Sequence, residues 1–104
     1  MLTDTHCHIH EASYVDKQGA AERAAAAGVT RVICVGTDDT TSEEALRFAA
    51  AHEEAWASVG VHPHESKEGY DGVMRMAAEG GPKLVAIGEI GLDYFYTHSP
   101  KEVQ

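Results

Sequence analysis

The chain has 104 residues, of which 43% are hydrophobic, with a formal net charge of −9 and a pI of about 5.1. This length suits one small domain at most, and the apolar content is too high for a disordered chain. An acidic chain repels nucleic acid, so the composition excludes a simple basic nucleic-acid binder. We therefore expect a divalent cation wherever this protein handles a polyanion.

The two cysteines, Cys7 and Cys34, show no CxxC spacing, which argues against a zinc ribbon or a thioredoxin-like site. We interpret both as reduced thiols. The sequence shows neither a secretory signal at its N-terminus nor an apolar run of membrane-spanning length. The expectation is a cytoplasmic protein without membrane contact.

Short apolar, β-branched runs alternate with alanine-rich segments along the chain. The runs predict strands over residues 1–6, 30–36, 57–61 and 84–88. The segments between them predict helices over residues 17–27, from Thr41 or Ser42 to about 52, and over residues 70–78. Because the runs are continuously apolar rather than alternating, they favour a parallel sheet that is buried on both faces.

The predicted order of elements is β-α-β-α-β-α-β, in units of about thirty residues, the size of a βα repeat. This alternation indicates an α/β fold, with a parallel sheet and helices outside it. A (β/α)8 TIM barrel needs roughly 250 residues. The chain therefore supplies either a small open sheet or about half of a barrel. Residues 97–104 form a tail that we interpret as a loop leading into a further helix.

The first predicted strand ends in a histidine pair. Side chains alternate faces along a strand, so Asp4, His6 and His8 share one face while Cys7 points the other way and packs. Two imidazoles about 7 Å apart on one face can bind a single metal ion. HxH alone is a weak pattern, and a polar strand end in solvent is the simpler alternative.

Two further polar motifs follow predicted strands: GVHPH at residues 60–64 and GEIGLDY at residues 88–94. In parallel α/β folds, the carboxyl ends of the strands carry the functional site. Glu89 comes directly after an apolar run, where a carboxylate is costly unless it is paired or binds a metal. These three strand ends together favour a metal site.

Each of these residues also has a structural explanation. His62 can cap a strand end, His64 can be exposed, Glu89 can form a structural salt bridge, and Asp93 can simply begin a loop. His10 and Glu11 are expected to be solvated, and His98 to lie on the surface of the tail. His52 is expected at a helix C-terminus, where an imidazolium suits the helix dipole without any function.

Three segments resemble the motifs of the TatD family of metal-dependent deoxyribonucleases, which belongs to the amidohydrolase-like barrels. They are DTHCHIH at residues 4–10, GVHPH at 60–64 and AIGEIGLDY at 86–94, in the family's order and spanning nearly the whole chain. The resemblance implies a (β/α)8 metallohydrolase that cleaves DNA phosphodiester bonds, typically from an end. Residues 1–104 would then be a single partial domain, the N-terminal half of that barrel.

The resemblance also implies roles for particular residues. It implies three metal ligands: His6, His8 and Glu89, the last with a catalytic role as well. It implies contacts to substrate, or support of the ligands, by three more: His62, His64 and Asp93. The cofactors implied are two divalent ions, Mg, Mn or Zn, and the partner implied is a DNA substrate. No nucleic-acid-binding residue is assigned.

This sequence departs from the family pattern in two respects. Ile9-His10 stand where the family usually has a hydrophobic residue and an aspartate. The family's remaining ligands, two histidines and an aspartate from later strands, match no position here, and His98 lies too close to GLDY to serve as one. We therefore expect the 104-residue chain to be inactive alone.

Open barrel edges would favour self-association or pairing with a complementary C-terminal half. Two alternative functions stay open from the residues alone. One is a catalytically dead metal-binding or assembly fragment. The other is an amidohydrolase acting on a small amide, ester or lactone.

Overall fold

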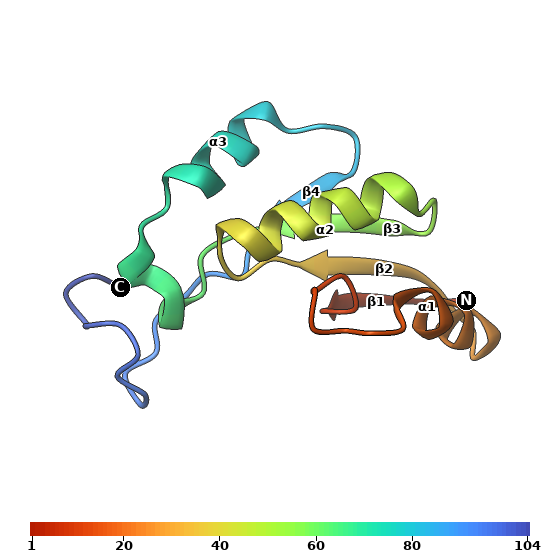
Figure 1. The fold of residues 1–104 in the computed structure, drawn as a ribbon, viewed down its shortest axis with the longest axis horizontal. Coiled ribbons are helices and arrows are strands. Elements are labelled where there is room, and N and C mark those ends of the chain that lie inside the picture. Colours follow the sequence, from red (N-terminus) through yellow and green to blue (C-terminus); the bar gives the residue numbers. More distant parts are fainter.

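The computed structural model describes residues 1–104, which form one parallel sheet in the strand order β1-β2-β3-β4 (Figure 1). The strands are β1 (Leu2–Cys7), β2 (Val29–Val35), β3 (Ala55–Val59) and β4 (Leu84–Ile87). The helices are α1 (Lys17–Ala26), α2 (Asp39–Ala51) and α3 (Asp71–Glu79), with a short 3-10 helix, η1 (Pro63–Glu68), between β3 and α3. None of these helices has the length and hydropathy needed to cross a membrane.

The predicted order of elements and the parallel α/β fold are confirmed, and each strand boundary lies within two residues of its prediction. The start of α2 was predicted wrongly, because Asp38 is the N-cap rather than Thr41 or Ser42. The Asp38 carboxylate accepts from the Thr41 N–H at 2.7 Å, and the Thr41 hydroxyl accepts from the Asp38 N–H at 3.1 Å. This reciprocal pair begins the helix three residues early.

The core lies between one face of the sheet and the helices α2 and α3, and Figure 1 shows α2 lying along β3. Alternate residues of the inner strands point toward the helices, as the period of a strand requires. The larger cluster comprises Val32, Cys34, Ala45, Phe48, Ala49, Ala55 and Ala57. A smaller cluster joins Val59 of β3 to Val73 and Met76 of α3. This packing fixes the strand ends from which the site is built.

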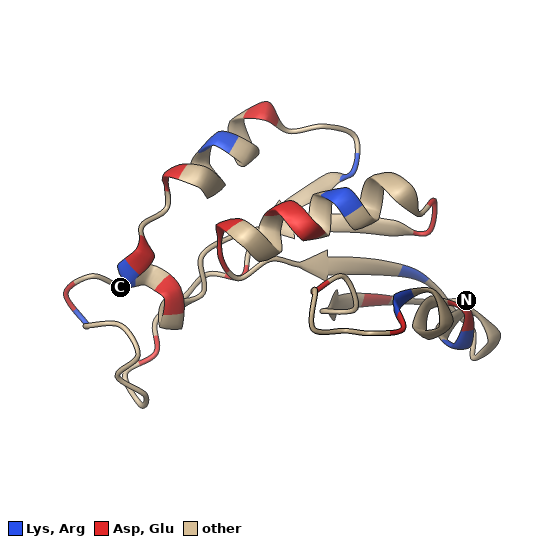
Figure 2. Cartoon of the chain, viewed as in Figure 1, with Lys and Arg blue, Asp and Glu red and all other residues tan.

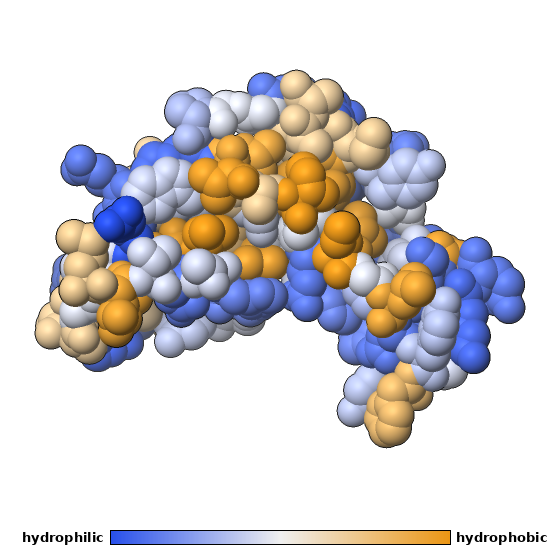
Figure 3. Space-filling view, turned by 180° about the vertical axis from the view of Figure 1, so that it is seen from behind, coloured by the Kyte–Doolittle hydropathy of each residue, from blue (hydrophilic) through white to orange (hydrophobic).

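The opposite face of the sheet is open, so the prediction of burial on both faces is wrong. Val85 of β4 lines this face and is 49% exposed, because no second layer covers it. Figure 3 shows apolar side chains gathered over the middle of the side of the molecule that is hidden in Figure 1. A hollow on the open face of the sheet is lined by Thr3, Arg31, Ile33, Trp56 and Val85.

His10 is buried, which corrects the expectation that it is solvated. The segment after β1 folds back against α2, where the Ala12 N–H donates to the Glu44 carboxylate at 3.2 Å, and His10 is left 2% exposed. Neither ring nitrogen of His10 has a hydrogen-bond partner, and burial lowers its pKa to about 4. His52 lies at the end of α2, as expected, with its ring stacked on that of Phe48.

Candidate metal centre

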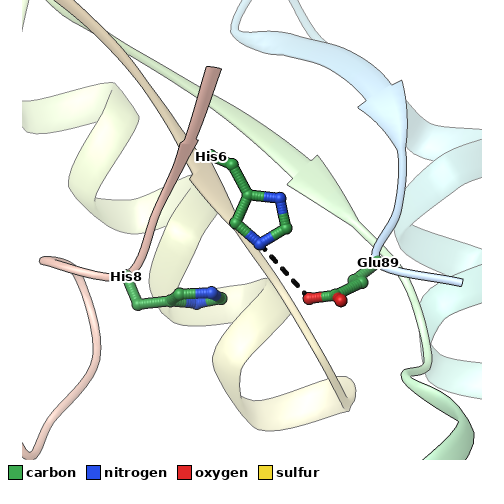
Figure 4. Close-up of side chains that lie close together, drawn as sticks. All are labelled: His6, His8 and Glu89. Atoms are coloured by element: carbon green, nitrogen blue, oxygen red, sulfur yellow. Dashed lines mark ion pairs between the residues drawn. The ribbon is translucent and has the colours of Figure 1, made fainter. Parts of the chain in front are cut away.

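His6, His8 and Glu89 converge at the carboxyl edge of the sheet, although β1 and β4 are its two outermost strands (Figure 4). One ligand atom from each residue lies within 4.8 Å of the others. His6 Nε2 is 3.3 Å from Glu89 Oε2. The two imidazole centroids are 5.1 Å apart, closer than an extended strand predicts, because β1 ends at Cys7 and His8 lies beyond it.

The backbone around Glu89 is held by the neighbouring strand ends. The Gly88 N–H donates to the Val59 carbonyl and the Glu89 N–H donates to the Gly36 carbonyl, both at 2.8 Å. Gly60 permits this close approach, because a Cβ there would lie 2.4 Å from the carbonyl carbon of Gly88. Residues 88–89, which follow β4, therefore pass directly over Gly60 at the end of β3. This path places the Glu89 carboxylate.

The donor set fits a divalent ion. His8 Nδ1 is a buried nitrogen that makes no hydrogen bond. It lies 3.1 Å from Glu11 Oε1, but the two groups are not aligned for a hydrogen bond. Two imidazoles and a carboxylate, with ligand atoms within 4.8 Å of one another, are a combination that Zn²⁺ and Mn²⁺ accept.

A cleft of about 400 Å³ lies beside His8 and Glu89, and no apolar side chain lines it. Its lining comprises His8, Glu11, Thr37, His62, His64, Glu65 and Glu89. His62 Nε2 lies 3.6 Å from Glu89 Oε1, so Glu89 stands between two imidazoles. Figure 2 shows the lysines and arginines spread along the chain rather than gathered at this edge. Such a cleft suits a charged, hydrated group, with cations supplying the positive charge.

His64 and Asp93 form an ion pair on the flank of the cleft. His64 Nε2 contacts Asp93 Oδ2, and this contact, together with the backbone N–H groups of Tyr96 and Phe95, holds the pKa of Asp93 below its ordinary value of 3.8. Asp93 thus begins a loop and pairs with a histidine at the same time. The Gln104 side chain donates to the Asp93 carbonyl at 2.9 Å, which fastens this loop at its far end.

Some cleft residues were not predicted from the sequence. Glu11 was expected to be solvated, yet its carboxylate faces the ring of His8, and Thr37 and Glu65 also line the cleft. Thr37 and Glu65 follow β2 and β3 closely in sequence, and that position is the signal that could have found them. His98 is exposed and lies outside the metal cluster, as expected, although its ring centroid is 4.5 Å from that of His64.

Cys7 faces away from the imidazoles and packs against the larger core cluster, as predicted. Its sulfur lies 3.9 Å from that of Cys34, and both thiols are free. Donation from the Cys34 thiol lowers the pKa of Cys7, while the same contact and burial raise the pKa of Cys34.

The sequence model of the family described as "TatD related DNase" matches residues 3–104. The chain belongs to the TatD-related DNase family. The resemblance inferred from the three motifs is therefore confirmed, and it covers nearly all of the chain.

Two relatives illustrate the match. The metal-dependent hydrolase YabD of Bacillus subtilis is 36% identical over 109 residues, which is 100% of this chain and 42% of that protein. The 3′-5′ ssDNA/RNA exonuclease TatD of Salmonella typhimurium is 36% identical over 93 residues, covering 86% of this chain and 35% of that protein. The chain thus spans less than half the length of these relatives.

Solved structures of the TatD family agree with this fold. The TatD homologue YJJV of Escherichia coli superposes with a TM-score of 0.81 at 30% identity, over 96% of this chain and 40% of that one. A TatD-family hydrolase of Entamoeba histolytica gives 0.82 at 24% identity and shares the fold, over 97% of this chain and 41% of that one. The four parallel strands and three α-helices are therefore the N-terminal half of a (β/α)8 TIM barrel.

Proposed function

We propose that residues 1–104 are a partial domain of a metal-dependent hydrolase that cleaves DNA phosphodiester bonds, trimming the strand from one end. The observation that carries this proposal is the convergence of His6, His8 and Glu89 beside an entirely polar cleft. Membership of the TatD-related DNase family, and the exonuclease named among the relatives, support the substrate class. The absence of apolar lining favours a charged substrate over a small amide, ester or lactone.

His6, His8 and Glu89 are the proposed metal ligands. Two imidazoles with one carboxylate favour Mn²⁺ or Zn²⁺, while Mg²⁺ prefers oxygen ligands. The family resemblance implies two ions, which Glu89 would help to hold, and these three residues would supply only part of the ligands for such a pair. The remaining ligands would come from later strands of the barrel.

Divalent ions held by these residues would supply a nucleophilic water at neutral pH and relieve the negative charge of a phosphodiester. The residues of this chain then orient the reacting groups. His62 faces Glu89 Oε1 and fixes the direction of that carboxylate. His64, held by Asp93, presents its ring at the flank of the cleft, where we place a contact to a substrate phosphate.

We further propose that the open face of the sheet is covered in the working enzyme, by a complementary C-terminal half or by a second copy of this chain. Two features support this proposal. β1 and β4 are unpaired edges, and Val85 is half exposed on the uncovered face. Without such a cover, the 104-residue chain is expected to lack nuclease activity. The free thiols Cys7 and Cys34 support a reducing, cytoplasmic location.

Metal binding and nuclease activity test the proposal separately. Calorimetric titration with Mn²⁺ should show binding by the wild-type chain and by Glu79→Gln, an exposed residue at the end of α3. Binding to Glu89→Gln should be weaker by at least about tenfold. Equal binding by both variants would overturn the metal assignment.

In parallel, Mn²⁺-dependent hydrolysis of single-stranded DNA should not exceed the Glu89→Gln background. Hydrolysis above that background would show that the chain assembles a complete site on its own. Metal binding without any hydrolysis, even after the open face is covered by a complementary half, would instead identify a catalytically dead metal-binding module.

A further inference from the structure

Cys7 and Cys34 face each other across the two neighbouring strands β1 and β2. They are register partners in the parallel sheet, and their sulfurs are 3.9 Å apart. No other cysteine is present in the chain. Cys7 stands between His6 and His8 but points to the opposite side of the strand, toward the core. The proposed metal ligands therefore do not compete for this thiol.

The backbone separation of this pair suits a disulfide. Neighbouring strands in a sheet lie about 4.7–4.9 Å apart, within the Cα separation of about 4.4–6.8 Å that a disulfide spans. The sulfurs must approach from 3.9 Å to about 2.05 Å. β1 is an edge strand and its pairing with β2 is irregular between Asp4 and Cys7, so its end has room to adjust.

The two thiols differ in access. Cys7 is partly exposed, whereas Cys34 is fully buried. An oxidant in solution therefore reaches Cys7 first, and Cys34 is the only thiol placed to react with the product. This asymmetry matches the arrangement of a peroxide-sensitive thiol and its resolving partner.

We propose that Cys7 and Cys34 form a redox-active pair that hydrogen peroxide converts to an intramolecular disulfide. The Cys7 sulfur attacks one peroxide oxygen, the O–O bond breaks, and the second oxygen leaves as water with the proton that Cys7 gave up. The Cys34 sulfur then attacks the Cys7 sulfenic acid, the S–S bond forms, the S–O bond breaks, and the oxygen leaves as water with the Cys34 proton. Two thiols are oxidised and one peroxide is reduced to two waters.

The disulfide links the edge strand to its neighbour at the residue between the two proposed metal ligands. It closes a loop from β1 through α1 to β2, which restricts the unfolded chain. The oxidised chain should therefore unfold at a higher urea concentration than the reduced chain. A reducing agent should restore the original midpoint.

Intact-mass spectrometry of the full 104-residue chain tests the proposal. Folded protein treated with dilute hydrogen peroxide should remain a monomer and lose the mass of two hydrogens, which dithiothreitol should restore. The same treatment in urea should form this bond more slowly, because the facing geometry is lost. Equal rates in both conditions, or only intermolecular disulfides, would overturn the proposal.

Two single variants assign the roles. Cys34→Ser should accumulate a sulfenic acid at Cys7 that dimedone traps, whereas Cys7→Ser should stay unmodified because Cys34 is buried. Circular dichroism shows whether each variant is folded. If either fails to fold, the comparison of folded and urea-treated wild-type protein decides the question. Dimedone labelling of folded wild-type protein at Cys7 without any disulfide would contradict the role of Cys34.

Discussion

Asp93 keeps its negative charge in acid because His64 faces it. Its folded-state pKa lies below the ordinary value of 3.8, so the carboxylate stabilises the fold at all pH values above 3.8. That contribution is lost as the pH falls from 3.8 through the lower folded-state value. Asp93→Asn should therefore lower the urea midpoint at pH 7 and match the wild-type midpoint in strong acid. Urea unfolding over a pH series measures this difference.

Glu102→Gln is the matched control for that series, because Glu102 is exposed and its midpoint should follow the wild-type value throughout. A stability difference between Asp93→Asn and wild-type protein that stays constant with pH would show that the ion pair with His64 is not its source.

His10 places two unpaired nitrogens in the packed region beside α2. A buried polar atom without a partner costs about 1–3 kcal/mol, and leucine has a similar volume. His10→Leu should therefore raise the free energy of unfolding by about 1 kcal/mol. The control His98→Leu, at an exposed position, should change it by less than about 0.5 kcal/mol. Lower stability in His10→Leu would indicate that the ring has a hydrogen-bond partner, such as an ordered water.

The motifs predicted which residues converge at the carboxyl edge of the sheet but not all of their neighbours. His6, His8 and Glu89 were candidates because they follow strands, whose carboxyl ends meet at one edge of a parallel sheet. Their role as metal ligands stays a prediction. The burial of His10 was not predictable, because it depends on how the segment after β1 folds back against α2. Glu11 was missed for the same reason: only the turn after β1 brings its carboxylate to His8.

Gly60 is a positioning residue for Glu89, because residues 88–89 pass directly over it at the end of β3. A methyl group there would lie 2.4–2.7 Å from backbone atoms of Gly88 and Glu89, so the segment must move. Gly60→Ala should weaken Mn²⁺ binding by roughly tenfold although every proposed ligand remains. Calorimetric titration measures this loss, and circular dichroism confirms the fold.

Gly88→Ala is the matched control for that experiment. A Cβ at Gly88 would meet only the Ser58 hydroxyl, at 4.0 Å, so this variant should bind Mn²⁺ nearly as wild-type protein does. Unchanged affinity in Gly60→Ala would show that the end of β4 can shift without displacing the carboxylate.

At the level of elements, long periodic segments were predictable and short-range hydrogen bonding was not. The strands were found because their apolar runs are bounded by glycine and polar residues. The start of α2 was missed because Asp38 and Thr41 cap each other, a choice that depends on geometry as well as residue type. η1 was missed because a six-residue 3-10 helix has no hydrophobic period to detect.

For the molecule as a whole, the apolar runs predicted strands buried on both faces, but the helices cover only one face here. The helices cover the side that carries Val32 and Cys34, and the side with Val85 stays open. The sequence of the strands thus reflects the complete barrel rather than the 104 residues of this chain. For this reason the fold class was predictable and the burial was not.

The open face should cause weak self-association. Sedimentation velocity should show an average sedimentation coefficient that rises with protein concentration, because exposed apolar patches attract one another. Val85→Lys should reduce this rise, while Met74→Lys, on the exposed side of α3, should not. A wild-type chain that stays monomeric throughout would show that the open face does not drive association.

The proposed metal ligands come from β1 and β4 or directly follow them, and these are the two outermost strands, so metal binding should depend on how the sheet is assembled. In a flat sheet β1 and β4 would stand roughly 14 Å apart, three strand spacings, yet His6 Nε2 and Glu89 Oε2 are 3.3 Å apart. The reach of the two side chains, the path of residues 88–89 over the end of β3 and the curvature of the sheet together close that gap. An ion bound there is therefore sensitive to how tightly the sheet is rolled. Any partner that sets the curvature then changes metal affinity, and the metal changes the affinity for that partner by the same factor. Calorimetric titration at several protein concentrations tests this linkage, because Mn²⁺ affinity should then change as the protein associates.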